Sequence, residues 1–194
     1  MLSEYPGYNS PEFLEEQGQD GCFIRTCADY AEFIGKVETP AFDIGAENPK
    51  IRIICSELSC QIESIDFGNI DYNDVSVGVY PEAKTIFCLS ILEHLTNPKF
   101  FLRNITRNMN SNAVLYLSTP GRMKMLQNKV CHFHEMKPDH LNKWLIEPLG
   151  LKIVEMAKIR IYRPWYFYLT GFRPLLRLLF DYTNIYKIML ETEK

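Results

Sequence analysis

The segment FDIGAENP, at residues 42–49, most constrains what this chain can fold into. It is an apolar strand end that carries an acid, Asp43, followed by a glycine, Gly45. This pattern is typical of the first turn of a nucleotide-binding α/β unit, because glycine lets the backbone turn tightly and approach a ligand. Asp66 lies 23 residues after Asp43, at the end of the next expected strand, where an acid can accept hydrogen bonds from ribose hydroxyls.

Length and composition indicate one intracellular α/β domain. The 194 residues are 46% hydrophobic, enough for a sizeable core, and the net charge of −3 creates no field that favours nucleic acid. The chain begins without a basic and apolar leader pattern, and no uncharged apolar run reaches the ~18 residues that span a bilayer. The six cysteines form no CxxC pair and are typical of buried thiols in a reducing compartment. We expect a single cytoplasmic domain over 1–194, with an N-terminal arm and helices at 1–40.

Local signals predict alternating helices and strands. Proline at a first helical position starts several helices, and Pro40 and Gly150 end two of them. The predicted helix ending at Gly150 directs Leu141, Trp144 and Leu145 inward. The expected helices are 11–17, 26–37, 49–58, 96–109 and 138–149, and the expected strands are 41–44, 62–67, 85–89, 114–117 and an antiparallel closing pair at 151–161 and 185–190.

The middle of the chain is short for this architecture. Only 18 residues, 67–84, separate two of the expected strands, where a helix, a strand and their linkers normally need about 25–35. The stretch is also rich in turn-forming residues. We therefore expect the third, edge strand to be reduced or lost, with 68–81 largely irregular.

Three further segments support the interpretation of FDIGAENP as the first turn of a nucleotide-binding unit. They are KTIFCLSILEHLTNPKFFLRNI (84–105), NAVLYLSTP (112–120) and FHEMKPDHLNKWLIEPLGLKIVEM (133–156). Together with FDIGAENP they resemble the class I S-adenosylmethionine-dependent methyltransferases, specifically the small-molecule branch, over residues 39–155. The resemblance implies a Rossmann-like α/β fold with a mixed, mainly parallel sheet and an antiparallel C-terminal hairpin. It also implies S-adenosylmethionine as the cofactor.

The donor site implied by the resemblance lies at the carboxyl ends of the strands. Glu47 and Pro49 stand where the family has further glycines, and Glu47 would repel a pyrophosphate, which disfavours NAD and FAD. The sulfonium cation of S-adenosylmethionine tolerates a nearby acid. A glycine turn and a strand-end acid with no ligand remain the alternative. The candidate cofactor-binding residues are Asp43, Gly45, Ala46, Asp66, Phe67, Cys88, Leu89 and Ser90.

Histidines supply the candidate catalytic groups. His94 belongs to ILEHL, whose position is similar to a Glu-His pair of many small-molecule methyltransferases, and His132 and His134 belong to CHFHE at 131–135. No second Cys or His pair accompanies them, so no zinc site is expected. A histidine has a pKa suited to a general base, and His134 is preferred because Glu135 follows it. Packing or solvated loop roles remain open for all three histidines.

The segment 162–182 is an aromatic and basic insert between the two closing strands. It contains YRPWYFYLTGFRPLLRLLFDY, in which three arginines are the only charges before Asp181. The composition fits peripheral contact with a membrane or a lipid-linked acceptor. A helical hairpin over the active site, or a homodimer contact, fits it as well.

Taken together, the sequence predicts a methyltransferase that acts on a small-molecule or glycan- or lipid-linked acceptor, at oxygen more than at carbon. A degenerate, non-catalytic methyltransferase-like binding module is the alternative, because the glycine loop is eroded. An oxidoreductase is disfavoured by Glu47.

Overall fold

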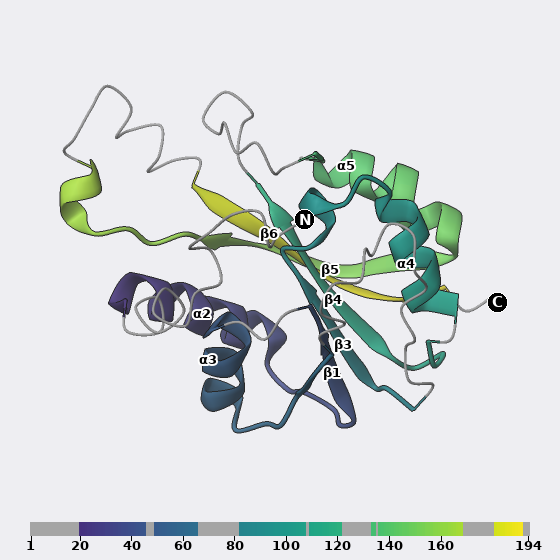
Figure 1. The fold of residues 1–194 in the computed structure, drawn as a ribbon, viewed down its shortest axis with the longest axis horizontal. Helices are drawn as coiled ribbons and strands as arrows, with labels where there is room; N and C mark the ends of the chain where they lie inside the picture. The colour runs from purple at the N-terminus through teal and green to yellow at the C-terminus, as the bar shows by residue number, and fades with distance from the viewer. Residues whose placement is uncertain are drawn as a thin grey trace.

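A six-stranded mixed sheet forms the centre of the protein (Figure 1). The computed structural model describes residues 20–45, 49–65, 82–107, 109–121, 133–134, 136–168 and 181–191. The strand order is β2-β1-β3-β4-β6-β5. The first four strands in this order are parallel, whereas β6 pairs antiparallel with both β4 and β5, which confirms the predicted fold class. The strands are β1 (Ala41–Ile44), β2 (Glu63–Ile65), β3 (Thr85–Leu89), β4 (Val114–Pro120), β5 (Leu151–Arg160) and β6 (Tyr182–Leu190).

Helices cover both faces of the sheet. Figure 1 shows α2 (Gly21–Ile34) and α3 (Pro49–Leu58) on one side, and α4 (Pro98–Arg107) and α5 (Pro138–Leu141) on the other. Each face has its own hydrophobic cluster. We call them the α2–α3 core and the α4–α5 core. Because side chains alternate along a strand, neighbours such as Phe87 and Cys88 belong to different cores.

Single residues determine where several of the helices begin or end. The predicted helix 26–37 is displaced: α2 begins at Gly21 because the Asp20 side chain accepts a hydrogen bond from the Cys22 amide at 2.9 Å. It ends before Gly35, whose φ of 67° is left-handed. In α4, the Asn97 side chain accepts from the Phe100 amide at 3.2 Å, which caps that helix.

The helical stretch after α5 departs from the predicted regular helix. Residues 142–146 form a π-helical turn, η4 (Asn142–Ile146), followed by the 3-10 turn η5 (Glu147–Leu149). Leu141 and Leu145 are buried as predicted, but Trp144 is 68% exposed, so its expected inward position is wrong. The wider π turn changes which positions align along the helix. Gly150 ends the stretch in the left-handed conformation, as predicted.

The hairpin partner β6 joins the parallel and antiparallel halves of the sheet. Its pairing with β4 runs from Leu115 opposite Ile188 to Pro120 opposite Thr183. Just beyond β4, the Gly121 amide donates to the Tyr182 carbonyl at 3.0 Å. A Cβ atom at Gly121 would overlap the Tyr182 ring, so only glycine fits there.

Two predictions fall outside the described residues: the helix at 11–17, and the reduced third strand with its irregular stretch at 68–81. Among the described helices, none is both long enough and apolar enough to cross a lipid bilayer.

Candidate functional site

Asp43 is a buried acid at the carboxyl end of β1. Its side chain lies on the sheet face covered by α2 and α3 and is 2% exposed. Its Oδ2 atom has no hydrogen-bond partner among the described residues. Burial raises the pKa of this carboxyl from 3.8 to about 7, an effect that the nearby Lys50 ammonium partly offsets. A buried carboxyl oxygen without a hydrogen bond is costly, and a buried carboxyl with a raised pKa is a candidate for a ligand-binding group.

Lys50 supplies a positive charge beside Asp43. It lies in the first turn of α3, and its Nζ donates to the Ser90 Oγ at 3.1 Å and lies 5.0 Å from the centroid of the Tyr30 ring. Lys50 is not among the site residues predicted from the sequence. The signal was present, because a lysine directly after the glycine turn and Pro49 must lie near the carboxyl ends of the strands.

Gly45 forms the turn that follows β1. Its φ of 133° lies in a region that residues with a side chain rarely adopt. A Cβ atom would also come within 3.2 Å of the Ile91 Cδ1. The turn therefore requires glycine, as the sequence pattern predicted, whereas its contact with a ligand stays a prediction.

Ser90 fixes the end of β3 to the end of β4. Its φ is 61°, an unusual value for a residue other than glycine, and its amide donates to the Ser118 Oγ at 2.9 Å. The two hydroxyl oxygens are 3.4 Å apart. Backbone strain of this kind is often found at functional sites. Ser90, Lys50 and Asp43 thus form a polar group at the carboxyl ends of β1 and β3.

Cys88 and Leu89 are packing residues. Cys88 has no exposed surface and belongs to the α4–α5 core, where burial raises the pKa of its thiol well above the usual value. Leu89 is 5% exposed in the α2–α3 core. Their predicted contact with a donor is not tested by this packing. Three other residues predicted to bind the methyl donor lie outside the described residues: Ala46, Asp66 and Phe67.

The two histidine motifs meet on the other side of this edge. The 3-10 turn η2 (Leu92–His94) carries Glu93, whose carbonyl accepts from the amides of Phe133 and His134 at 2.7 and 3.4 Å. The His134 Nε2 also lies 3.4 Å from the Thr96 carbonyl oxygen. The structure therefore joins the backbone of His134 to the turn that carries His94, whereas His132 lies outside the described residues. No group of metal-binding side chains is found in the part of the chain that the structure describes.

A second buried polar group, missed by our sequence analysis, lies where β4 and β6 pair. Thr119 is opposite Asn184, and Leu117 is opposite Tyr186, so the side chains of Thr119, Asn184 and Tyr186 share one face. All three are at most 4% exposed. The Tyr186 hydroxyl lies near Thr119 and Asn184, but the three side-chain oxygens have no partner in good hydrogen-bond geometry among the described residues. Burial raises the pKa of Tyr186, so its hydroxyl stays protonated and available as a donor.

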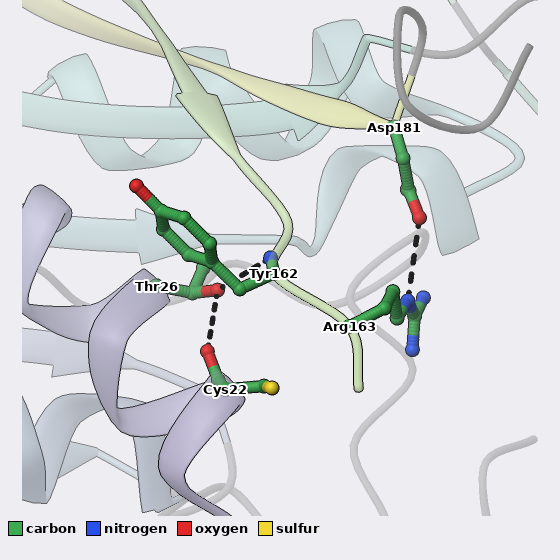
Figure 2. A network of polar contacts seen from close by, with 5 residues as sticks. All are labelled: Cys22, Thr26, Tyr162, Arg163 and Asp181. Atoms are coloured by element: carbon green, nitrogen blue, oxygen red, sulfur yellow. Dashed lines mark hydrogen bonds and ion pairs between the residues drawn. The ribbon is translucent and has the colours of Figure 1, made fainter. Parts of the chain in front are cut away.

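The two ends of the insert are anchored to the body (Figure 2). The Thr26 Oγ1 donates to the Cys22 carbonyl at 3.0 Å and accepts from the Tyr162 amide at 3.2 Å, which ties the end of β5 to α2. The Arg163 Nε pairs with the Asp181 Oδ2 at 3.3 Å, which joins the beginning and the end of the insert.

A hollow of about 680 Å³ lies away from these groups, between α3 and the beginnings of β1 and β2. It contains no predicted site residue. We place the candidate site at the opposite, carboxyl edge, where the buried polar groups converge.

The sequence matches no known protein-family model and no curated protein. Similar solved structures include the complex of the Haloferax volcanii methyltransferase activator Trm112 with a proposed methyltransferase: TM-score 0.61, 10% identity, 87% of this chain and 90% of that chain covered. Magnesium protoporphyrin IX methyltransferase from Synechocystis PCC 6803, solved with bound S-adenosylhomocysteine, has a TM-score of 0.53 at 12% identity, with 95% and 90% covered. The [4+2]-cyclase SpnF is also similar, with a TM-score of 0.53 at 12% identity and 88% and 82% covered. The chain therefore has the fold of the class I S-adenosylmethionine-dependent methyltransferases.

Proposed function

We propose that the protein is an S-adenosylmethionine-dependent methyltransferase that methylates a hydroxyl group of a small-molecule or glycan- or lipid-linked acceptor. The observation that carries this proposal is the buried carboxyl of Asp43 beside the Gly45 turn, whose Oδ2 atom has no hydrogen-bond partner among the described residues. The fold supports the proposal, because ligands of open α/β sheets bind at the carboxyl ends of the strands.

The charge of the donor suits this site. S-adenosylmethionine carries a sulfonium and an ammonium group, and either can add a positive charge beside the Asp43 Oδ2 atom, which has no hydrogen-bond partner among the described residues. A dinucleotide would instead bring a pyrophosphate close to Asp43 and Glu47. Lys50 is the feature that favours an anion, but its ammonium already contacts Ser90 and the Tyr30 ring. Comparison of the donor with NAD therefore tests the assignment directly.

The acceptor would lie between the histidine motifs and the polar group of Thr119, Asn184 and Tyr186. S-adenosylmethionine would be held at Asp43 and the Gly45 turn, and it would supply an electrophilic methyl group to the acceptor oxygen while its sulfur keeps the electron pair of the broken bond. The hydroxyl proton passes to a base, for which we propose His134, with His94 and His132 as alternatives. The oxygens of Thr119, Asn184 and Tyr186, which have no partner in good hydrogen-bond geometry among the described residues, would hold a hydroxylated acceptor.

A non-catalytic binding module is the second candidate. Its support is the replacement of later glycines by Glu47 and Pro49 in the loop after β1. The similarity to a [4+2]-cyclase adds that this fold also hosts other chemistry.

Isothermal titration calorimetry with S-adenosylmethionine, S-adenosylhomocysteine and NAD tests the donor assignment. We expect binding of the first two and not of NAD. Asp66→Ala should weaken binding of S-adenosylhomocysteine by about 1–3 kcal/mol, the cost of leaving ribose hydroxyls unpaired. Binding of NAD alone would refute the proposal. If the donor binds but no acceptor is methylated in a panel of hydroxylated compounds, the binding module is favoured.

A further inference from the structure

A pair of exposed aromatic side chains stands at the far end of β5. The 3-10 turn η6 (Trp165–Tyr168) presents Trp165 at 74% and Tyr166 at 57% exposure, with their rings edge to face at 6.3 Å. Figure 1 shows η6, in yellow-green, projecting from the sheet and from both helical layers. Two large aromatic side chains gathered at a protruding tip fit a contact surface better than isolated exposed residues do.

Positive charges surround the base of this tip. The Arg25 and Arg160 guanidinium groups lie 4.3 and 5.8 Å from the centroid of the Tyr162 ring. The Lys158 ammonium lies 5.0 Å from the centroid of the Tyr182 ring. Aromatic rings hold these three exposed cations in position without neutralising them. Among the described residues near this tip, Arg163 is paired with an acid, the buried Asp181.

We propose that this surface, the aromatic tip with Trp165, Tyr166 and the cations Arg25, Lys158 and Arg160, binds the interface of an anionic lipid bilayer. Tryptophan and tyrosine favour the headgroup region, because one part of each ring system is apolar and another forms hydrogen bonds. Basic side chains beside them are attracted to anionic headgroups. The protein's overall charge of −3 does not prevent this, because the attraction acts over about one Debye length.

The sequence that follows η6 is also rich in apolar and basic residues. Residues 169–180, LTGFRPLLRLLF, contain two arginines, seven large apolar side chains and no acid. A second copy of the chain is a poorer occupant, because a two-fold contact would place the same cations against one another.

The two tryptophans of the chain give a direct assay. Trp144→Phe leaves Trp165 as the only tryptophan, and Trp165→Phe leaves Trp144, which is similarly exposed, on the α5 side of the sheet. We expect vesicles of phosphatidylcholine with 30% phosphatidylserine to shift the Trp165 emission to shorter wavelength. Brominated lipids should quench it. In the Trp165→Phe protein the Trp144 emission should stay unchanged under both treatments.

Co-sedimentation with the same vesicles measures the affinity. Lys158→Gln with Arg160→Gln should reduce binding by about 25-fold at low salt, since each cation near the surface contributes about fivefold. Trp165→Ser with Tyr166→Ser should reduce it by roughly tenfold. These changes lie on the surface, so thermal melting should match that of the wild type. Absence of binding to anionic vesicles, or a blue-shifted Trp165 in a dimer without lipid, would overturn the proposal. Because this assay needs no donor or acceptor, its outcome is independent of the proposed activity.

Discussion

The buried carboxyl of Asp43 should make the affinity for the proposed donor depend on pH. In the free protein its pKa is raised to about 7 by burial, against the lowering effect of Lys50. A positively charged donor bound beside Asp43 requires the carboxylate form. Binding must therefore be accompanied by loss of a proton whenever the free carboxyl is protonated.

The size of the change in affinity follows from the fraction of free protein in which Asp43 is ionised. With a pKa of 7, about 3% of molecules carry the carboxylate at pH 5.5 and about 76% at pH 7.5. The apparent dissociation constant is the intrinsic value divided by this fraction. The affinity for S-adenosylmethionine should therefore rise about 25-fold between pH 5.5 and 7.5.

Calorimetry across this range, in buffers of different ionisation enthalpy, measures both the affinity and the number of protons released. Asp43→Asn is the matched control, because it keeps the shape of the side chain and removes its titration. The Asp43→Asn protein should bind the donor more weakly than the wild type, and its affinity should not change with pH over this range. Lys50→Met should move the midpoint of the affinity change to higher pH, because the Lys50 ammonium lowers the pKa of Asp43.

Histidines also titrate in this window. The slope is therefore assigned to Asp43 only if Asp43→Asn abolishes it. A wild-type affinity that is constant from pH 5.5 to 7.5, or an Asp43→Asn protein that keeps the slope, would refute the reasoning.

Three further predictions concern turnover and stability. His134→Ala should lower turnover about 10²-fold or more with donor affinity nearly unchanged in calorimetry; equal loss of both would remove His134 from the base role. The folded pKa of Asp43 lies above its unfolded value, so its stabilising contribution is present below pH 3.8 and is lost as the pH rises through about 7. The free energy of urea unfolding of Asp43→Asn, relative to that of the wild type, should therefore increase by roughly 3 kcal/mol between pH 5 and 8. A difference between the two proteins that stays constant over this range would contradict the prediction. Gly121→Ala should destabilise by about 1–3 kcal/mol, since its Cβ would overlap the Tyr182 ring, and an unchanged melting temperature would show that the ring moves aside freely.

Elements with strong local signals could be predicted from the sequence. The structure confirms 41–44, 49–58 and 85–89 with the bounds expected, because a proline or glycine marks an end or an apolar run fills the strand. The start of α2 was misplaced because the Asp20 cap lies before a glycine and a cysteine that resemble a loop. Trp144 was misplaced because a regular helical period does not foresee a π turn.

The candidate site was only partly predictable for a different reason. Asp43, Gly45 and Ser90 lie in or beside motifs that a reader can recognise within a few residues. The group of Thr119, Asn184 and Tyr186 depends on the register between strands separated by more than 60 residues, and sequence alone does not fix that register. The burial that raises the pKa of Asp43 likewise depends on how α2 and α3 pack.

The division of the interior into two cores has a consequence for how such a protein can diversify. The side chains beside Asp43 pack with α2 and α3, whereas η2 and α5, which flank His134, pack in the α4–α5 core. The sheet backbone separates the two, and distant substitutions without shared contacts act nearly additively. A lineage can therefore exchange apolar residues under the histidine motifs, and so reshape the proposed acceptor side, while the packing around Asp43 and the Gly45 turn is inherited unchanged.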